Sequence, residues 1–89
     1  MGRRDPIGTE AEDAATESVV LQQVLALHPT SLTVAELHRA LGAEEDGFAA
    51  ADAVERAVRD LTGAGLLHRS GSLVVPTRAA LRFDELLER

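Results

Sequence analysis

Apolar side chains recur at helical spacing between residues 52 and 63 of this chain. Val54, Val58 and Leu61 are separated by four and three residues, so on a helix they form one apolar stripe. Gly63 and Gly65 follow, and glycine adopts the left-handed backbone with which helices commonly end. The pattern predicts a helix that buries this stripe and ends at the two glycines.

Two short apolar runs come next, at residues 66–69 and 73–75. They are separated by Ser70, Gly71 and Ser72, and short apolar runs around a small, glycine-containing turn are typical of a β-hairpin. We therefore predict two antiparallel strands joined by this turn.

An earlier amphipathic helix should run to about Leu27, because Pro29 disfavours helical geometry at His28. Its apolar stripe comprises Val20, Leu21, Val24, Leu25 and Leu27.

After an extended link at Ser31 and Leu32, a second helix should follow Thr33, since Thr33 and Glu36 have the spacing of a capping box. Its core-facing residues would be Val34, Leu37, Ala40 and Leu41, with Gly42 at its end.

A last helix should begin at Arg78, because Thr77 follows Pro76 and is a natural N-cap. Its apolar side comprises Ala79, Ala80, Phe83, Leu86 and Leu87. That side should pack on the first helix. Alternatively, Phe83, Leu86 and Leu87 form a dimer face against the same helix of a second subunit.

The run Leu61, Ala64, Gly65, Leu66 and Leu67 resembles the winged helix-turn-helix family of bacterial transcriptional regulators, in which the recognition helix leads through Ala-Gly-Leu into the first wing strand. The resemblance covers roughly residues 18–87. It implies an α+β, mostly α fold with a three-helix core, a small antiparallel hairpin wing and, here, an additional C-terminal helix. It also implies that Leu32 enters a short strand beside the wing, and that double-stranded DNA is the partner.

At 89 residues the chain has room for one domain. Residues 1–17 contain Pro6, Gly8 and several carboxylates, which suggests a disordered acidic tail before a winged-helix domain at 18–89. An alternative is that Thr9 and Glu12 form a capping box and that a helix begins near Glu10. Aromatic residues make up only 2% of the chain, so Phe48 and Phe83 should be the largest side chains in a core of Leu, Val and Ala.

The net charge of −6 is opposite in sign to what a nucleic-acid domain usually has. Even residues 18–89 hold seven arginines against ten carboxylates. The link between the second and third helices is longer than the usual three or four residues and contains Glu44, Glu45 and Asp46, which would repel phosphate.

The exposed face of the third helix should carry Asp52, Glu55, Arg56, Arg59 and Asp60. Their spacing predicts three intrahelical ion pairs: Asp52 with Arg56, Glu55 with Arg59, and Arg56 with Asp60. If DNA is bound, the candidate contacts are the four arginines near the third helix and the wing, together with two wing serines. These are Arg56, Arg59, Arg69, Arg78, Ser70 and Ser72.

Catalytic and metal chemistry have little support in the sequence. There is no cysteine, and His28, His38 and His68 lack the paired spacing of a metal site. His38 and His68 should lie on the surface. We expect no enzymatic activity, no cofactor and no small-molecule ligand. With no apolar run long enough for a signal peptide or a membrane span, we expect a cytoplasmic protein.

The sequence leaves two functions, of which the first is the prediction and the second the alternative. One is a small DNA-binding transcriptional regulator, acting as a homodimer or with a larger partner. The other is an acidic winged-helix module that binds proteins and has little or no affinity for DNA.

Overall fold

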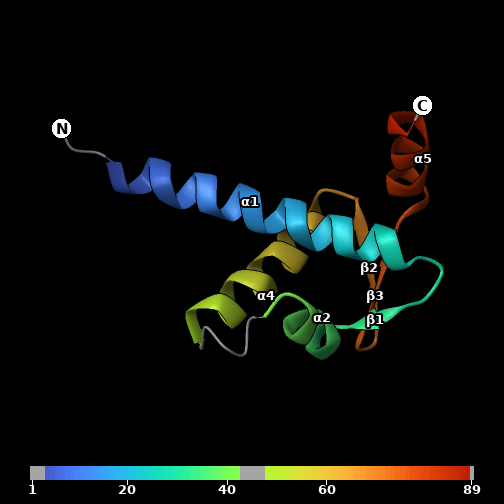
Figure 1. The fold of residues 1–89 in the computed structure, drawn as a ribbon, viewed down its shortest axis with the longest axis horizontal. Helices are drawn as coiled ribbons and strands as arrows, with labels where there is room; N and C mark the ends of the chain where they lie inside the picture. Colours follow the sequence, from blue (N-terminus) through green and yellow to red (C-terminus); the bar gives the residue numbers. More distant parts are fainter. Residues whose placement is uncertain (1–3, 43–47, 89) are drawn as a thin grey trace.

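The computed structural model describes the backbone of residues 4–42 and 48–88 and the side chains of residues 12–42 and 51–88. Within these ranges the chain is α+β and mostly helical, with four helices and a three-stranded antiparallel sheet. The long helix α1 crosses the molecule, α2 and α4 lie along one side of it, and α5 stands on the other side, near its C-terminal end (Figure 1). The elements in order are α1 (Arg4–Leu27), β1 (Leu32–Thr33), α2 (Val34–Ala40), α4 (Phe48–Gly63), β2 (Leu67–Ser70), β3 (Leu73–Pro76) and α5 (Arg78–Leu87).

Helix α1 differs from expectation at its beginning. It is continuous from Arg4 to Leu27, so the expected tail at 1–17 is helical from residue 4 onward. Thr9 lies inside the helix and is not its N-cap. Pro6 is tolerated because it falls in the first turn, where the backbone N–H has no partner within the helix. The C-terminal limit at Leu27 is as predicted.

Helix α2 begins with the predicted capping box. The Glu36 backbone N–H donates to Thr33 Oγ1 at 3.0 Å, and the Thr33 N–H donates to Glu36 Oε1 at 2.9 Å. Gly42, with φ of 72°, follows Leu41 at the end of the helix. The acidic residues Glu44, Glu45 and Asp46 lie outside the described residues.

Helix α4 ends in a Schellman motif, which satisfies two carbonyls of its last turn. The Leu66 N–H donates to Leu61 O at 2.9 Å, and the Gly65 N–H donates to Thr62 O at 3.1 Å. Gly65 supplies the left-handed conformation with φ of 87°. Gly63 does not, and is instead the last helical residue.

The predicted hairpin is present, with its first strand shifted by one residue. Strand β3 lies between β1 and β2, and Arg69 pairs with Val74 while Ser70 pairs with Leu73. The two-residue turn Gly71–Ser72 has a positive φ only at Gly71, 63°, which favours a type II′ turn over type I′. Leu32 pairs with Val74 in the short strand that the resemblance implied.

The core forms where α1, α2 and α4 meet the inner face of the sheet. Val54, Val58 and Leu61 are buried as predicted, with exposed fractions of 3%, 0% and 5%. Three expectations fail: Leu27 and Ala40 are exposed, and Phe83 is 58% exposed. The side chain of Phe48 lies outside the described residues. The buried aliphatic cluster comprises Val20, Val24, Leu32, Leu37, Val54, Ala57, Val58, Leu61, Leu67 and Val74.

Thr77 connects the end of α4 to the beginning of α5. Its Oγ1 accepts from the Ala80 N–H at 3.2 Å as the predicted N-cap, and donates to Gly65 O at 2.7 Å. Its backbone N–H donates to Leu66 O at 3.0 Å. One residue therefore sets where α5 leaves the body of the protein.

We predict that Thr77→Ala lowers the free energy of unfolding by about 1–2 kcal/mol, because it removes both the cap and the bond to Gly65. Thr77→Ser keeps the hydroxyl and should stay close to wild type. Urea unfolding followed by circular dichroism measures both variants. Equal midpoints for Thr77→Ala and wild type would contradict this role of Thr77.

Candidate functional site

The predicted DNA-reading face of α4 is partly neutralised by residues from outside the helix. The Arg56 guanidinium contacts Asp52 on its own helix. It also contacts Asp13 of α1, with Arg56 Nη2 3.2 Å from Asp13 Oδ1. Only the first of these contacts was predicted. Among the described residues, neither Glu55 with Arg59 nor Arg56 with Asp60 approaches within an ion-pair distance of 4.0 Å. Arg56 is therefore held at the seam between α1 and α4.

Several carboxylates also lie at this seam between α1 and α4. Burial raises the pKa of Glu17 above its ordinary value, and the neighbouring carboxylates of Asp60 and Asp13 raise it further. This cluster was not predicted from the sequence, because Asp13 and Glu17 were assigned to a tail. We call Asp13, Glu17 and Asp60 the acidic seam. It places negative charge beside the arginine that was expected to meet phosphate.

The raised pKa of Glu17 means that its ionised form is less favourable in the folded protein than in the unfolded chain. The resulting destabilisation is present at neutral pH and disappears as the pH falls below the ordinary value of 4.5, where Glu17 is protonated in both states. Because Glu17 is partly exposed, the effect should be a fraction of about 1 kcal/mol.

We therefore predict that Glu17→Gln raises the urea midpoint slightly at pH 7 and that the two proteins converge near pH 4. Glu12→Gln, an exposed position on the same helix, removes the same charge outside the seam and serves as the control. A lower midpoint for Glu17→Gln than for wild type at pH 7 would show that the seam is not repulsive.

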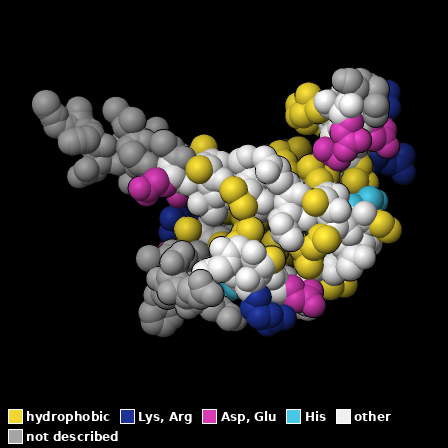
Figure 2. Space-filling model, viewed as in Figure 1, with side chains coloured by type: hydrophobic (Ala, Val, Ile, Leu, Met, Phe, Trp, Pro, Cys, Tyr) yellow, Lys and Arg dark blue, Asp and Glu magenta, His cyan; other side chains and the backbone are white. Residues whose placement is uncertain are grey.

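The remaining candidate DNA contacts are exposed and come from different elements. Arg59 lies on the outward face of α4 with Asp52 and Glu55. Arg69 and Ser70 are successive residues of β2, so their side chains stand on opposite faces of the hairpin. Ser72 is in the turn, and Arg78 begins α5. In Figure 2 the arginine-coloured areas lie apart from one another, each with Asp or Glu nearby.

Helix α5 turns its large apolar side chains away from the body. Ala80 is its buried residue, at 2% exposure, while the predicted dimer-face residues Phe83, Leu86 and Leu87 are 58%, 53% and 67% exposed. Their spacing of three and four residues puts them on one side of the helix. We call these three residues the α5 stripe. The packing of this side on α1, which the sequence analysis favoured, is not found.

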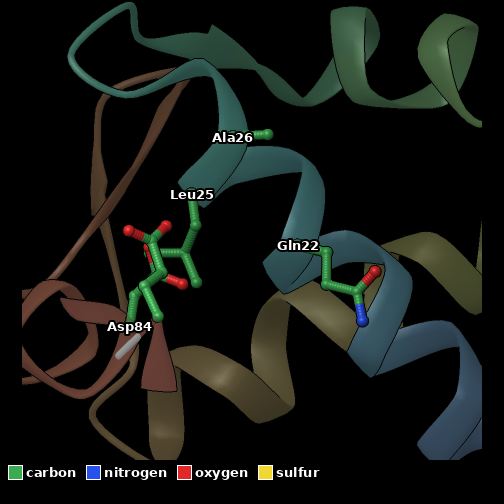
Figure 3. A pocket seen from close by; sticks show the side chains of 5 residues that line it. Gln22, Leu25, Ala26 and Asp84 are labelled. Atoms are coloured by element: carbon green, nitrogen blue, oxygen red, sulfur yellow. The ribbon is translucent and has the colours of Figure 1, made fainter. Parts of the chain in front are cut away.

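A shallow hollow separates α5 from α1. It has a volume of about 280 Å³ and is lined by Gln22, Leu25 and Ala26 from α1 and by Asp84 and Glu88 from α5. Figure 3 shows Leu25 of α1 and Asp84 of α5 among the side chains that line it. Helix α5 therefore faces α1 with polar residues, which explains why its apolar side is left free.

His38 is less exposed than expected. Its side chain is 19% exposed, and Nε2 lies 3.8 Å from Glu55 Oε2 across the contact between α2 and α4. His28 and His68 are exposed, as was expected for His68. No group of three His, Asp or Glu side chains in the described ranges could hold a metal ion.

Comparisons with protein-family models, with curated proteins and with solved structures found no match to this chain. Among the helices at residues 4–40 and 48–87, none has the length and apolar character needed to cross a membrane.

Proposed function

We propose that this protein is a winged helix that serves as a protein-interaction module. Three features support the winged-helix assignment: the order of helices and strands, the pairing of β1 with the hairpin strand β3, and the glycine-ended helix α4 that leads directly into β2. All three agree with the arrangement implied by the resemblance of residues 61–67.

The observation that carries the functional proposal is the α5 stripe. Phe83, Leu86 and Leu87 are each more than half exposed on one side of one helix. Single exposed apolar residues are ordinary, whereas a contiguous group on a helix face is typical of an interaction surface. Three of the six large apolar side chains that are exposed among the described residues belong to the stripe.

The charges of α4 favour the same interpretation. A guanidinium could leave exposed carboxylate partners at a cost of about 0.2–1 kcal/mol per pair, so the ion pairs of Arg56 alone do not prevent a phosphate contact. The acidic seam would remain in place, however, and would repel the incoming phosphate. Among the residues whose side chains are described, six arginines face ten carboxylates. The surface near α4 therefore lacks the positive field that drives DNA association.

DNA-binding transcriptional regulation is the second candidate. In its favour, Arg59, Arg69 and Arg78 are exposed and make no ion pair with another described residue. Arg69, Ser70 and Ser72 on the wing, together with Arg59 of α4 or Arg78 of α5, could contact a DNA backbone without Arg56.

We predict no saturable binding of a mixed-sequence duplex up to about 100 μM protein at low salt, where non-specific binders reach Kd values of roughly 10⁻⁴–10⁻⁶ M or tighter. Fluorescence anisotropy of a labelled duplex measures this. Binding that weakens steeply with salt, and that is lost in Arg69→Ala but kept in Arg82→Ala, would overturn the proposal in favour of DNA. Arg82 is a suitable control because it is exposed on α5 and is not one of the candidate DNA contacts.

A further inference from the structure

We propose that the α5 stripe binds the same stripe of a second copy of this chain, with the two α5 helices antiparallel across a two-fold axis. This inference rests on the proposed interaction function and specifies its partner.

The stripe suits a helix-on-helix contact. Phe83, Leu86 and Leu87, with the small exposed Ala79 one turn before Phe83, occupy one side of α5. The side turned towards the body carries Ala80, which is buried and borders the stripe at Leu87, and Asp84, which lines the hollow beside α1. Helix α5 is thus fixed to its own domain on one side and free along the other (Figure 1).

The charges beside the stripe are self-complementary only in the antiparallel orientation. Arg82 lies beside Leu86 at one edge of the stripe, and Glu85 lies beyond Arg82 off the same edge. Their side chains are 68% and 66% exposed and 3.2 Å apart. A two-fold axis between residues 83 and 84 places Arg82 of each copy opposite Glu85 of the other. In a parallel pair related by a two-fold axis, this edge of one copy lies on the far side of the contact from the same edge of the other, so Arg82 and Glu85 find no such cross-pair.

The net charge of −6 on each copy also favours the antiparallel arrangement. Both domain bodies are attached at the N-terminal end of α5, through Thr77. Antiparallel helices therefore put the two bodies at opposite ends of the pair. Parallel helices would bring two like-charged bodies together at one end, where they repel.

The contact is small. Helix α5 has ten residues and offers three large apolar side chains, so the interface falls below the roughly 1,200–2,000 Å² of a standard stable complex. We therefore expect a dissociation constant of about 1 μM or weaker, in the range of transient dimers.

Sedimentation equilibrium of the full chain over a wide concentration range tests the association. Wild type should pass from monomer to dimer as concentration rises. The double variant Phe83→Ser, Leu86→Ser should weaken association about tenfold or more. Val19→Ser, which removes an apolar side chain that is 47% exposed on α1, is the matched control and should leave association unchanged. Circular dichroism establishes that each variant is folded.

A charge exchange tests the flanking contacts. R82E and E85R should each weaken self-association, because each variant carries two like charges beside its stripe. An equimolar mixture of the two should associate again, because every cross-pair then joins opposite charges.

Cross-linking tests the orientation. The chain has no native cysteine, so introduced thiols report directly. Positions 79 and 87 lie eight residues apart, about 12 Å along a helix. An antiparallel pair brings residue 79 of one copy near residue 87 of the other. Mixing differently tagged A79C and L87C should therefore give mainly the mixed disulfide.

A monomer at all concentrations would overturn this inference, as would association that survives the loss of Phe83 and Leu86. Preferential A79C–A79C disulfides would overturn the antiparallel geometry. These results are distinct from failure of the proposed function. A monomer that binds no DNA leaves the interaction function with a different partner, whereas salt-dependent DNA binding overturns that function whatever the oligomeric state.

Discussion

The burial of the α4 apolar stripe against α1 and the sheet determines which surfaces of this protein face outward. Val54, Val58 and Leu61 are almost completely buried. Burial of a large aliphatic side chain stabilises a fold by roughly 1.5–3 kcal/mol, whereas an exposed ion pair contributes at most about 1 kcal/mol. The apolar contacts therefore set the rotation of α4 about its axis, and the charged residues take the positions that remain. Arg56 consequently reaches α1, and Glu55 lies beside His38 of α2.

The same packing places α5. Because α4 ends at a fixed point in the core, the carbonyls of Gly65 and Leu66 are available to Thr77, which begins α5. The side of α5 nearest the body carries the buried Ala80 and the partly buried Leu81 and Asp84, and Phe83 lies outside it. The Phe83 side is left in solvent as a result. The exposed stripe is thus a consequence of where the Thr77 cap directs the helix.

The rotation of α4 and the direction of α5 show which parts of the structure could be predicted from the sequence. The Thr33 capping box, the Gly65 helix end, the Gly71 turn and the Thr77 cap were all predicted, because each depends on residues within a few positions of one another. Contacts between residues far apart in the chain were harder to predict. The partner of Arg56 on α1 is 43 positions away, and it was invisible once residues 1–17 were assigned to a tail. The periodicity of α5 identified its apolar side but could not reveal whether that side meets α1.

The extension of α1 towards Arg4 links the charge of the protein to its proposed function. By continuing through Asp13 and Glu17, α1 lies along α4 and adds carboxylates to the flank of the helix that the resemblance assigns to DNA reading. An exposed Phe and two Leu on α5 would ordinarily favour indiscriminate association, and a large net charge opposes such association by repulsion. Only a contact that keeps the negatively charged domains of the two copies apart avoids this repulsion. The negative charge that disfavours phosphate binding therefore also limits the arrangements in which a partner can cover the α5 stripe. It favours two copies joined end to end over a compact pair.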